Sequence, residues 1–164
     1  MDGSGPHMES ARTENAFRAL IRAYGLVKRV MEPYFGRYGI SGSQWGVLRV
    51  LQRTEQDGLA GLRLTDLGDR LLIRPPSVTG VVDRLERQGL VARTTSTEDL
   101  RARHVSLTPT GRQLVERILR GHAERVESLL EGLRPEERAQ LHRLLDQMAA
   151  HLELMVEQEE TAVR

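Results

Sequence analysis

Residues 64–89 have the sequence LTDLGDRLLIRPPSVTGVVDRLERQG, in which two helical patterns are separated by a short turn. We predict a first helix over residues 64–72 and a turn at residues 73–74. Two prolines start the second helix, because proline is tolerated in the first turn, where its missing N–H would have no partner anyway. Gly89 ends this helix as a C-terminal cap. Two short helices joined in this way predict a helix-turn-helix.

The second helix has one apolar side and one polar side. Its apolar side consists of Val78, Val81, Val82 and Leu85, and its outer faces carry Ser77, Thr79, Gly80, Asp83, Arg84 and Arg87. In a helix-turn-helix, the outer face of this helix enters the major groove of DNA. The candidates for major-groove contacts are Pro75, Pro76, Ser77, Thr79 and Arg84. The alternatives are capping or solvation for the two hydroxyls, and an intrahelical ion pair with Asp83 or Glu86 for Arg84.

The residues after this helix predict a β-hairpin. Residues 90–94 and 103–107 alternate as strands, and residues 96–102 form a polar loop between them. A hairpin directly after the reading helix of a helix-turn-helix is a wing. Thr108 then caps a further helix that has Pro109 at its first position, where both residue types are favoured.

The flanking segments are helical by their apolar periodicity. We predict a long helix over residues 9–38, which Pro33 could kink, and a second helix capped by Ser43. The core face of this second helix is Trp45, Leu48, Val50 and Leu51. Residues 57–61 form a loop, and two more helices follow the wing, to about residue 130 and over residues 136–157. The predicted fold is mainly α with a small β-wing and about six helices.

Two segments resemble the MarR family of bacterial transcription regulators, and the helix order fits as well. Residues 82–91, VDRLERQGLV, resemble the end of the family's recognition helix. Residues 99–111, DLRARHVSLTPTG, resemble its wing signature, in which an Asp-x-Arg tip precedes a Leu-Thr-x-x-Gly helix start. Gly80 departs from the pattern, because many relatives have arginine there.

The resemblance implies a sequence-specific DNA-binding regulator: a ligand-responsive repressor that binds a pseudo-palindromic operator in double-stranded DNA as a homodimer. It implies one MarR-type domain with an N-terminal dimerisation helix (8–38), a winged helix-turn-helix lobe (39–107) and C-terminal dimerisation helices (108–164). We expect residues 1–7 to be a tag remnant. The alternative for the flanking helices is an intrachain bundle. The alternative function is a winged-helix protein-interaction module without DNA binding, against which the presence of Arg84 and Arg101 argues.

The resemblance also assigns roles to residues of the wing. Arg101 inserts into the minor groove, whose negative potential attracts arginine, and Asp99 supports it. From the residues themselves, we expect Arg103 and Arg93 on the wing strands either to contact phosphates or to pair with acidic residues. Further phosphate candidates are Arg74, Ser41 and Ser43, the two serines through hydroxyl and backbone N–H groups at a helix N-terminus; helix capping is the alternative for Ser43.

Composition restricts the remaining function classes. The chain has no cysteine, which excludes disulfides and thiol-based redox sensing, and we expect no metal, cofactor or membrane partner. Residues 70–104 carry seven arginines and four acidic residues, whereas residues 124–160 carry ten acidic residues and four arginines. This uneven distribution of charge favours binding of a polyanion at the arginine-rich segment, although ordinary solvated helix faces would also produce it. A cytoplasmic location is the default.

The resemblance further implies a site for a small aromatic or phenolic effector. The candidate pocket residues are Tyr34, Tyr38, Trp45 and Arg49, with core packing as the alternative for Trp45. An enzyme is not predicted, because the sequence has no glycine-rich phosphate loop and no nucleophile elbow.

Overall fold

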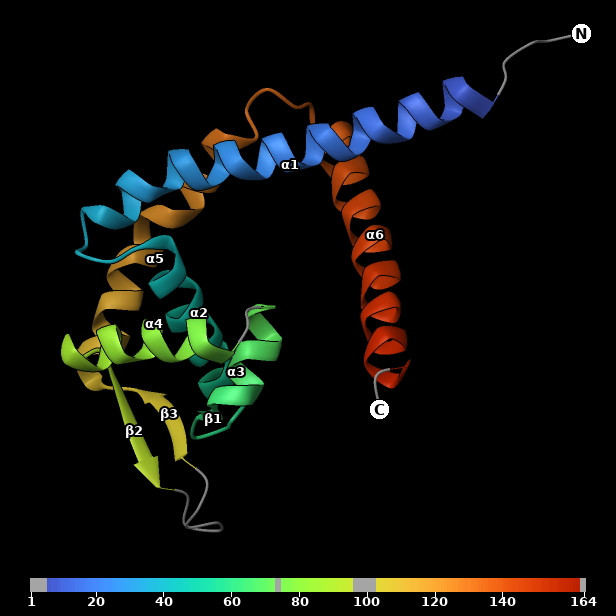
Figure 1. Ribbon diagram of the computed structural model, residues 1–164. Coiled ribbons are helices and arrows are strands. Elements are labelled where there is room, and N and C mark those ends of the chain that lie inside the picture. The colour runs from blue at the N-terminus through green and yellow to red at the C-terminus, as the bar shows by residue number, and fades with distance from the viewer. Residues whose placement is uncertain (1–5, 73–74, 96–102, 163–164) are drawn as a thin grey trace, which may run out of the picture. The chain divides into compact units, whose positions relative to one another are not determined.

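The computed structural model describes residues 6–72, 75–95 and 103–162 (Figure 1). These residues form, in chain order, α1 (Pro6–Gly36), α2 (Gly42–Gln56), β1 (Leu62–Arg63), α3 (Leu64–Leu71), α4 (Pro75–Arg87), β2 (Val91–Thr95), β3 (Arg103–Leu107), α5 (Pro109–Leu129) and α6 (Pro135–Ala162). The chain divides into two compact units, Met1–Gly121 and His122–Arg164. The mainly helical fold with a small sheet is confirmed.

The junction between α1 and α2 corrects one prediction. Ser41, not Ser43, is the N-cap of α2, because its hydroxyl accepts a hydrogen bond from the Gln44 N–H while the Gln44 side chain accepts one from the Ser41 N–H. This reciprocal pair is a capping box. The core face of α2 also differs from the predicted one, because Val47 is fully buried and Val50 is only half-buried. Pro33 lies within α1, and the helix continues past it to Gly36.

The helix-turn-helix consists of α3 and α4. Leu72 ends α3 in the left-handed region, with φ of 53°. Gly89 follows α4 with φ of 69°, and its N–H donates to the Glu86 carbonyl. The Leu90 N–H donates to the Leu85 carbonyl, which completes a Schellman motif. The C-terminal cap predicted at Gly89 is therefore confirmed.

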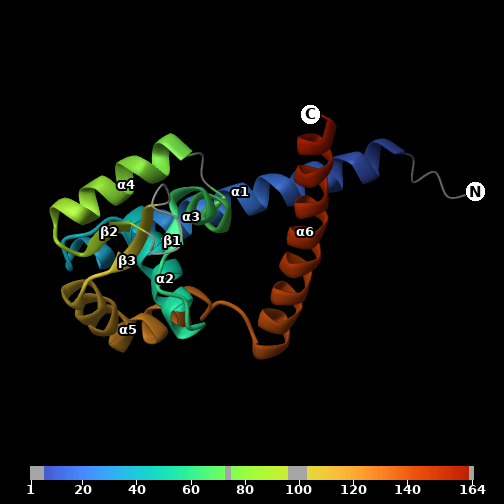
Figure 2. The same ribbon diagram turned by 90° about the horizontal axis from the view of Figure 1, so that it is seen from below.

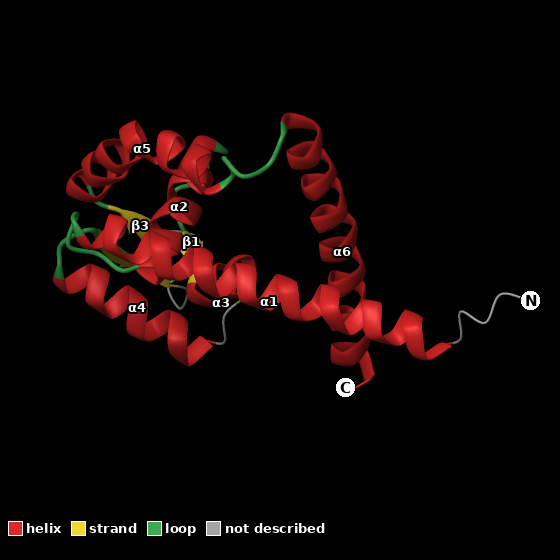
Figure 3. Cartoon of the chain, turned by 90° about the horizontal axis from the view of Figure 1, so that it is seen from above, coloured by secondary structure: helices red, strands yellow, loops and turns green. Residues whose placement is uncertain are grey.

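A small antiparallel sheet follows, with the strand order β1-β3-β2. Val91 pairs with Leu107 and Arg93 with Val105, so β2 and β3 form the predicted hairpin. The sheet lies between α4 and the beginning of α5 (Figures 2 and 3). The third strand, β1, was not predicted, because two residues are too few to show an alternating pattern.

The core of the first unit joins these elements. Its fully buried apolar side chains include Leu48, Leu51, Leu67, Val82, Leu85, Val105 and Ile118. Thr54 is a fully buried polar residue of this core, and it donates to the Val50 carbonyl and accepts from Arg70 at 3.1 Å. The bond from Arg70 fixes α3 against α2 and so supports the first half of the helix-turn-helix.

The start of α5 is fastened to the end of α4. Thr108 caps α5 through the Gly111 N–H at 3.0 Å, as predicted, and its hydroxyl also donates to the Gly89 carbonyl at 2.7 Å. Gly111 permits this close approach, because a Cβ atom there would lie 2.0 Å from the Leu90 carbonyl oxygen. The reading helix and α5 therefore share one rigid junction.

The second unit consists of the end of α5 and α6. Arg138 donates to the Leu130 and Leu133 carbonyls and pairs with Glu127, which fastens the turn before α6 to that helix. None of the described α6 side chains is buried. None of the helices in the described part of the chain is both long and apolar enough to span a membrane.

Candidate nucleic-acid interface

The outer face of α4 presents the predicted major-groove residues. Ser77, Thr79 and Arg84 are all exposed. Pro75 and Pro76 are the first two residues of α4, and their side chains lie outside the described set. Figure 1 shows α4 crossing the lobe, with the β2–β3 hairpin extending from its C-terminal end. A helix face and a hairpin therefore sit next to each other on this lobe.

Arg84 lies back along α4 over Gly80. A Cβ atom on Gly80 would be 3.8 Å from Arg84 Nη1, which is an ordinary contact. A helical side chain covers the turn that precedes its own Cα, so Arg84 occupies the surface that glycine leaves open. Among the described residues, Arg84 forms no ion pair, and the alternative of pairing with Asp83 or Glu86 is not what the structure shows.

Both of those acidic residues pair with Arg93 of β2 instead. Arg93 Nη2 lies 2.5 Å from Asp83 Oδ1, and Nη1 contacts Glu86 Oε2. Burial disfavours the charged guanidinium, but the hydrogen bonds and charges of Asp83 and Glu86 outweigh it and raise the pKa of Arg93. Of the two roles predicted for Arg93, pairing with acidic residues is the one that this conformation has, because both ends of the guanidinium are occupied.

The wing tip carries the other predicted contacts. Arg103 begins β3, and its side chain is not among those described. Arg74, Asp99 and Arg101 lie outside the described residues. The strands that bound the wing loop are paired up to Thr95 and Arg103, so the base of the hairpin is fixed.

The N-terminus of α2 holds the two serine candidates. Ser41 Oγ and Ser43 Oγ are 2.9 Å apart, and the Gly42 N–H donates to Glu32 Oε2 at 3.2 Å. A carboxylate of α1 therefore occupies part of the position where a phosphate was predicted, and it would repel a second anion. The remaining exposed group for a phosphate is at Ser43.

The same junction contains positioning residues that the sequence analysis missed. Gln44 Nε2 donates to Gln88 Oε1 at 2.7 Å, and Gln88 Nε2 donates to the Gly39 carbonyl at 3.1 Å. These bonds connect the end of α4 to the α1–α2 junction. The capping-box spacing of Ser41 and Gln44 was visible in the sequence, but the partner at Gln88 is 44 residues away.

The predicted pocket residues lie largely within the core of the first unit. Tyr34 is buried and donates to the Ile118 carbonyl at 2.7 Å, and Tyr38 contacts its ring edge-on. Trp45 is buried and stacks on Phe35, with ring centroids 5.5 Å apart. Core packing is therefore what the structure shows for Trp45.

Arg49 lies over the outer part of this cluster. Its guanidinium is 5.7 Å from the Trp45 ring centroid, and burial together with the charge of Arg53 lowers its pKa. It also donates to the Gln52 side chain. A cationic group beside aromatic rings would suit an aromatic acid. Among the described residues, no cluster of three or more potential metal ligands is found.

A helix-turn-helix followed by an antiparallel wing defines the chain as a winged-helix protein. The MarR family model matches residues 38–102. The chain is 30% identical over 143 residues to the HTH-type transcriptional regulator YkoM of Bacillus subtilis (strain 168), which covers 87% of this chain and 90% of that protein. It is 30% identical over 132 residues to the homoprotocatechuate degradative operon repressor of Escherichia coli, covering 80% and 86% of the two chains. The chain belongs to the MarR family of transcription regulators.

Solved structures agree with this assignment. BpsR of Bordetella bronchiseptica, whose DNA binding is regulated by 6-hydroxynicotinic acid, aligns with a TM-score of 0.73 and 28% identity over 82% of this chain and 98% of that chain. Nearly the whole length of BpsR therefore shares the fold of this chain.

Proposed function

We propose that this protein is a repressor that binds a pseudo-palindromic operator as a homodimer and releases it when a small aromatic effector binds. The observation that carries this proposal is the exposed face of α4, with Ser77, Thr79 and Arg84, beside the β2–β3 hairpin. Such a pairing places one element in the major groove and a second against the adjacent minor groove. The action is binding rather than catalysis, and it takes place in the cytoplasm, where bacterial DNA lies.

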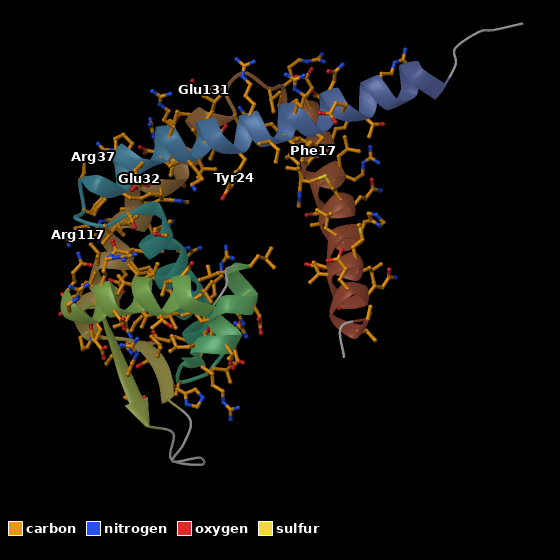
Figure 4. All side chains as sticks on the ribbon, in the orientation of Figure 1. Phe17, Tyr24, Glu32, Arg37, Arg117 and Glu131 are labelled. Carbon is orange, nitrogen blue, oxygen red and sulfur yellow. The ribbon has the colours of Figure 1, made fainter. Side chains whose placement is uncertain are left out.

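Exposed apolar side chains on two helices support the homodimer. On α1 the exposed apolar side chains recur every three or four residues, at Phe17, Ile21, Tyr24 and Val27. Figure 4 labels Phe17 and Tyr24, which are 59% and 62% exposed. Such a stripe on a helix requires another apolar surface.

The exposed apolar side chains of α6 make a second such stripe, at Leu141, Leu144, Leu145, Met148, Leu152 and Met155. A second copy of the chain would cover both stripes and give the two reading helices two-fold symmetry. This supports residues 8–38 and 108–164 as dimerisation segments.

Two observations support an effector that is an aromatic acid. Tyr34, Tyr38 and Trp45 supply aromatic surface, and Arg49 supplies a cation beside it. BpsR, which shares the fold, responds to 6-hydroxynicotinic acid. The effector of this chain would then bind at the edge of the core, where Tyr38 and Arg49 are half-buried.

The test is DNA binding by the full chain and by Arg101→Ala, measured by anisotropy of a fluorescein-labelled, mixed-sequence duplex. We expect wild type to bind at low salt and to lose affinity steeply as salt rises. Arg101→Ala should bind the duplex more weakly, with an unchanged Tm. The control is Arg143→Ala, which removes an exposed arginine of α6 and should bind the duplex as tightly as wild type. Absence of binding by wild type at low salt would favour the protein-interaction module.

A further inference from the structure

α4 carries negatively charged side chains, which is unfavourable for a helix that approaches DNA. α4 carries two acidic side chains, Asp83 and Glu86, and two arginines, Arg84 and Arg87, so it has no net charge of its own. Asp83 has a side chain that is 49% exposed, and that of Glu86 is 40% exposed. Carboxylates on this face would repel the phosphates on either side of the groove.

Arg93 supplies the missing positive charge from outside the helix. It lies in β2 and reaches both acidic residues, with Nη2 at 2.5 Å from Asp83 and Nη1 against Glu86. Its backbone N–H also donates to Glu86 Oε1 at 3.3 Å. The side chain of Arg93 is only 17% exposed, so it is held in this position rather than directed at solvent.

We propose that Arg93 is a positioning residue for DNA recognition, which offsets one of the two negative charges of Asp83 and Glu86 so that the reading face of α4 can approach the phosphate backbone. This proposal rests on the proposed DNA-binding function. It differs from a direct phosphate contact, because the guanidinium acts on the two carboxylates and not on DNA. Asp83, Glu86 and Arg93 together have a charge of −1, and removal of the arginine alone makes it −2.

The test removes the cation first and then the anions. We expect Arg93→Met to weaken binding of a fluorescein-labelled, mixed-sequence duplex about tenfold at about 50 mM salt, from the repulsion of carboxylates near phosphates. Adding Asp83→Asn and Glu86→Gln removes the carboxylates themselves. The triple variant should regain wild-type affinity within about threefold, with the wild-type slope of log K against log salt.

A direct phosphate contact and a purely mechanical brace give other results. If Arg93 bound a phosphate, the triple variant would stay weak and its salt slope would be shallower by about 0.9. If Arg93 only braced the hairpin, removing the two acidic residues would not restore the affinity. Either outcome, or full affinity of Arg93→Met, overturns the proposal.

A matched ion pair provides the control. Arg112 binds Glu55 through two hydrogen bonds of 2.8 Å, and this pair joins α5 to α2 without touching α4. Arg112→Met and Arg112→Met with Glu55→Gln should bind the duplex equally well. If wild type itself fails to bind the duplex at low salt, the proposed function fails, which is distinct from a failed rescue.

Discussion

Replacing Gly111 with alanine tests the junction between α5 and the reading helix. A Cβ atom at this position would lie 2.0 Å from the Leu90 carbonyl oxygen and 3.0 Å from its carbon. Carbon–oxygen contacts in proteins begin near about 3.3 Å, so the two backbones would have to separate by more than about 1 Å. The obstacle is backbone, which cannot rotate away as a side chain can.

The expected loss follows from two costs and one gain. Overpacking of this kind costs about 1–3 kcal/mol. The separation also breaks the bond from Thr108 to the Gly89 carbonyl, which is worth about 1 kcal/mol. Alanine is favoured over glycine in a helix by about 0.5–1 kcal/mol, which offsets part of this. We therefore expect Gly111→Ala to lower the free energy of unfolding by about 2 kcal/mol.

The matched control is Gly121→Ala in the same helix. There the nearest atom to a new Cβ is the Tyr34 hydroxyl at 3.5 Å, an ordinary contact, so the variant should be as stable as wild type or slightly more stable. Urea unfolding followed by circular dichroism at one protomer concentration compares the two, because dimer stability depends on concentration. A Gly111→Ala variant at least as stable as Gly121→Ala would refute the tight junction.

Three further predictions concern other described residues. Leu72→Gly should raise the free energy of unfolding, measured in urea, by about 0.5 kcal/mol. The reason is that the left-handed backbone is strained for leucine, whose side chain is 87% exposed and buries little. The control Leu59→Gly, in a loop, should not raise the free energy of unfolding. Hydrogen bonds from Arg134 lower the pKa of Glu137 in the folded protein. The stabilisation is therefore present above the unfolded-state pKa and is lost as the pH falls through the folded-state pKa. In Glu137→Gln, the free energy of unfolding should fall less steeply as the solution is acidified. Arg84→Met should weaken DNA binding in a gel shift without changing Tm, and unchanged affinity would remove this residue from the reading face.

Local patterns predicted the helix-turn-helix because its signals are close together in the chain. Proline starts α4, and Gly89 ends it with the left-handed conformation that the cap requires. Thr108 was likewise identified as the cap of α5. These predictions depend on residues within one turn of each other, where the backbone alone determines the outcome.

Local patterns alone did not decide the remaining features. Both Ser41 and Ser43 precede the apolar face of α2, and the one with the capping-box spacing to Gln44 is Ser41. The pairing of Arg93 with the two acidic residues of α4 requires the fold of β2 back along that helix. The close approach at Gly111 likewise exists only once α5 is in place, although the glycine itself belonged to the family signature.

Selection of bound duplexes from a random pool by the full chain tests the central claim most directly. A homodimer with one reading helix per protomer should enrich an inverted repeat whose half-sites are about 10 base pairs apart, centre to centre. The account predicts this repeat, with an A·T-rich segment where the wing would lie. If no sequence became enriched after repeated rounds, or if only a single unrepeated half-site did, the account would be contradicted.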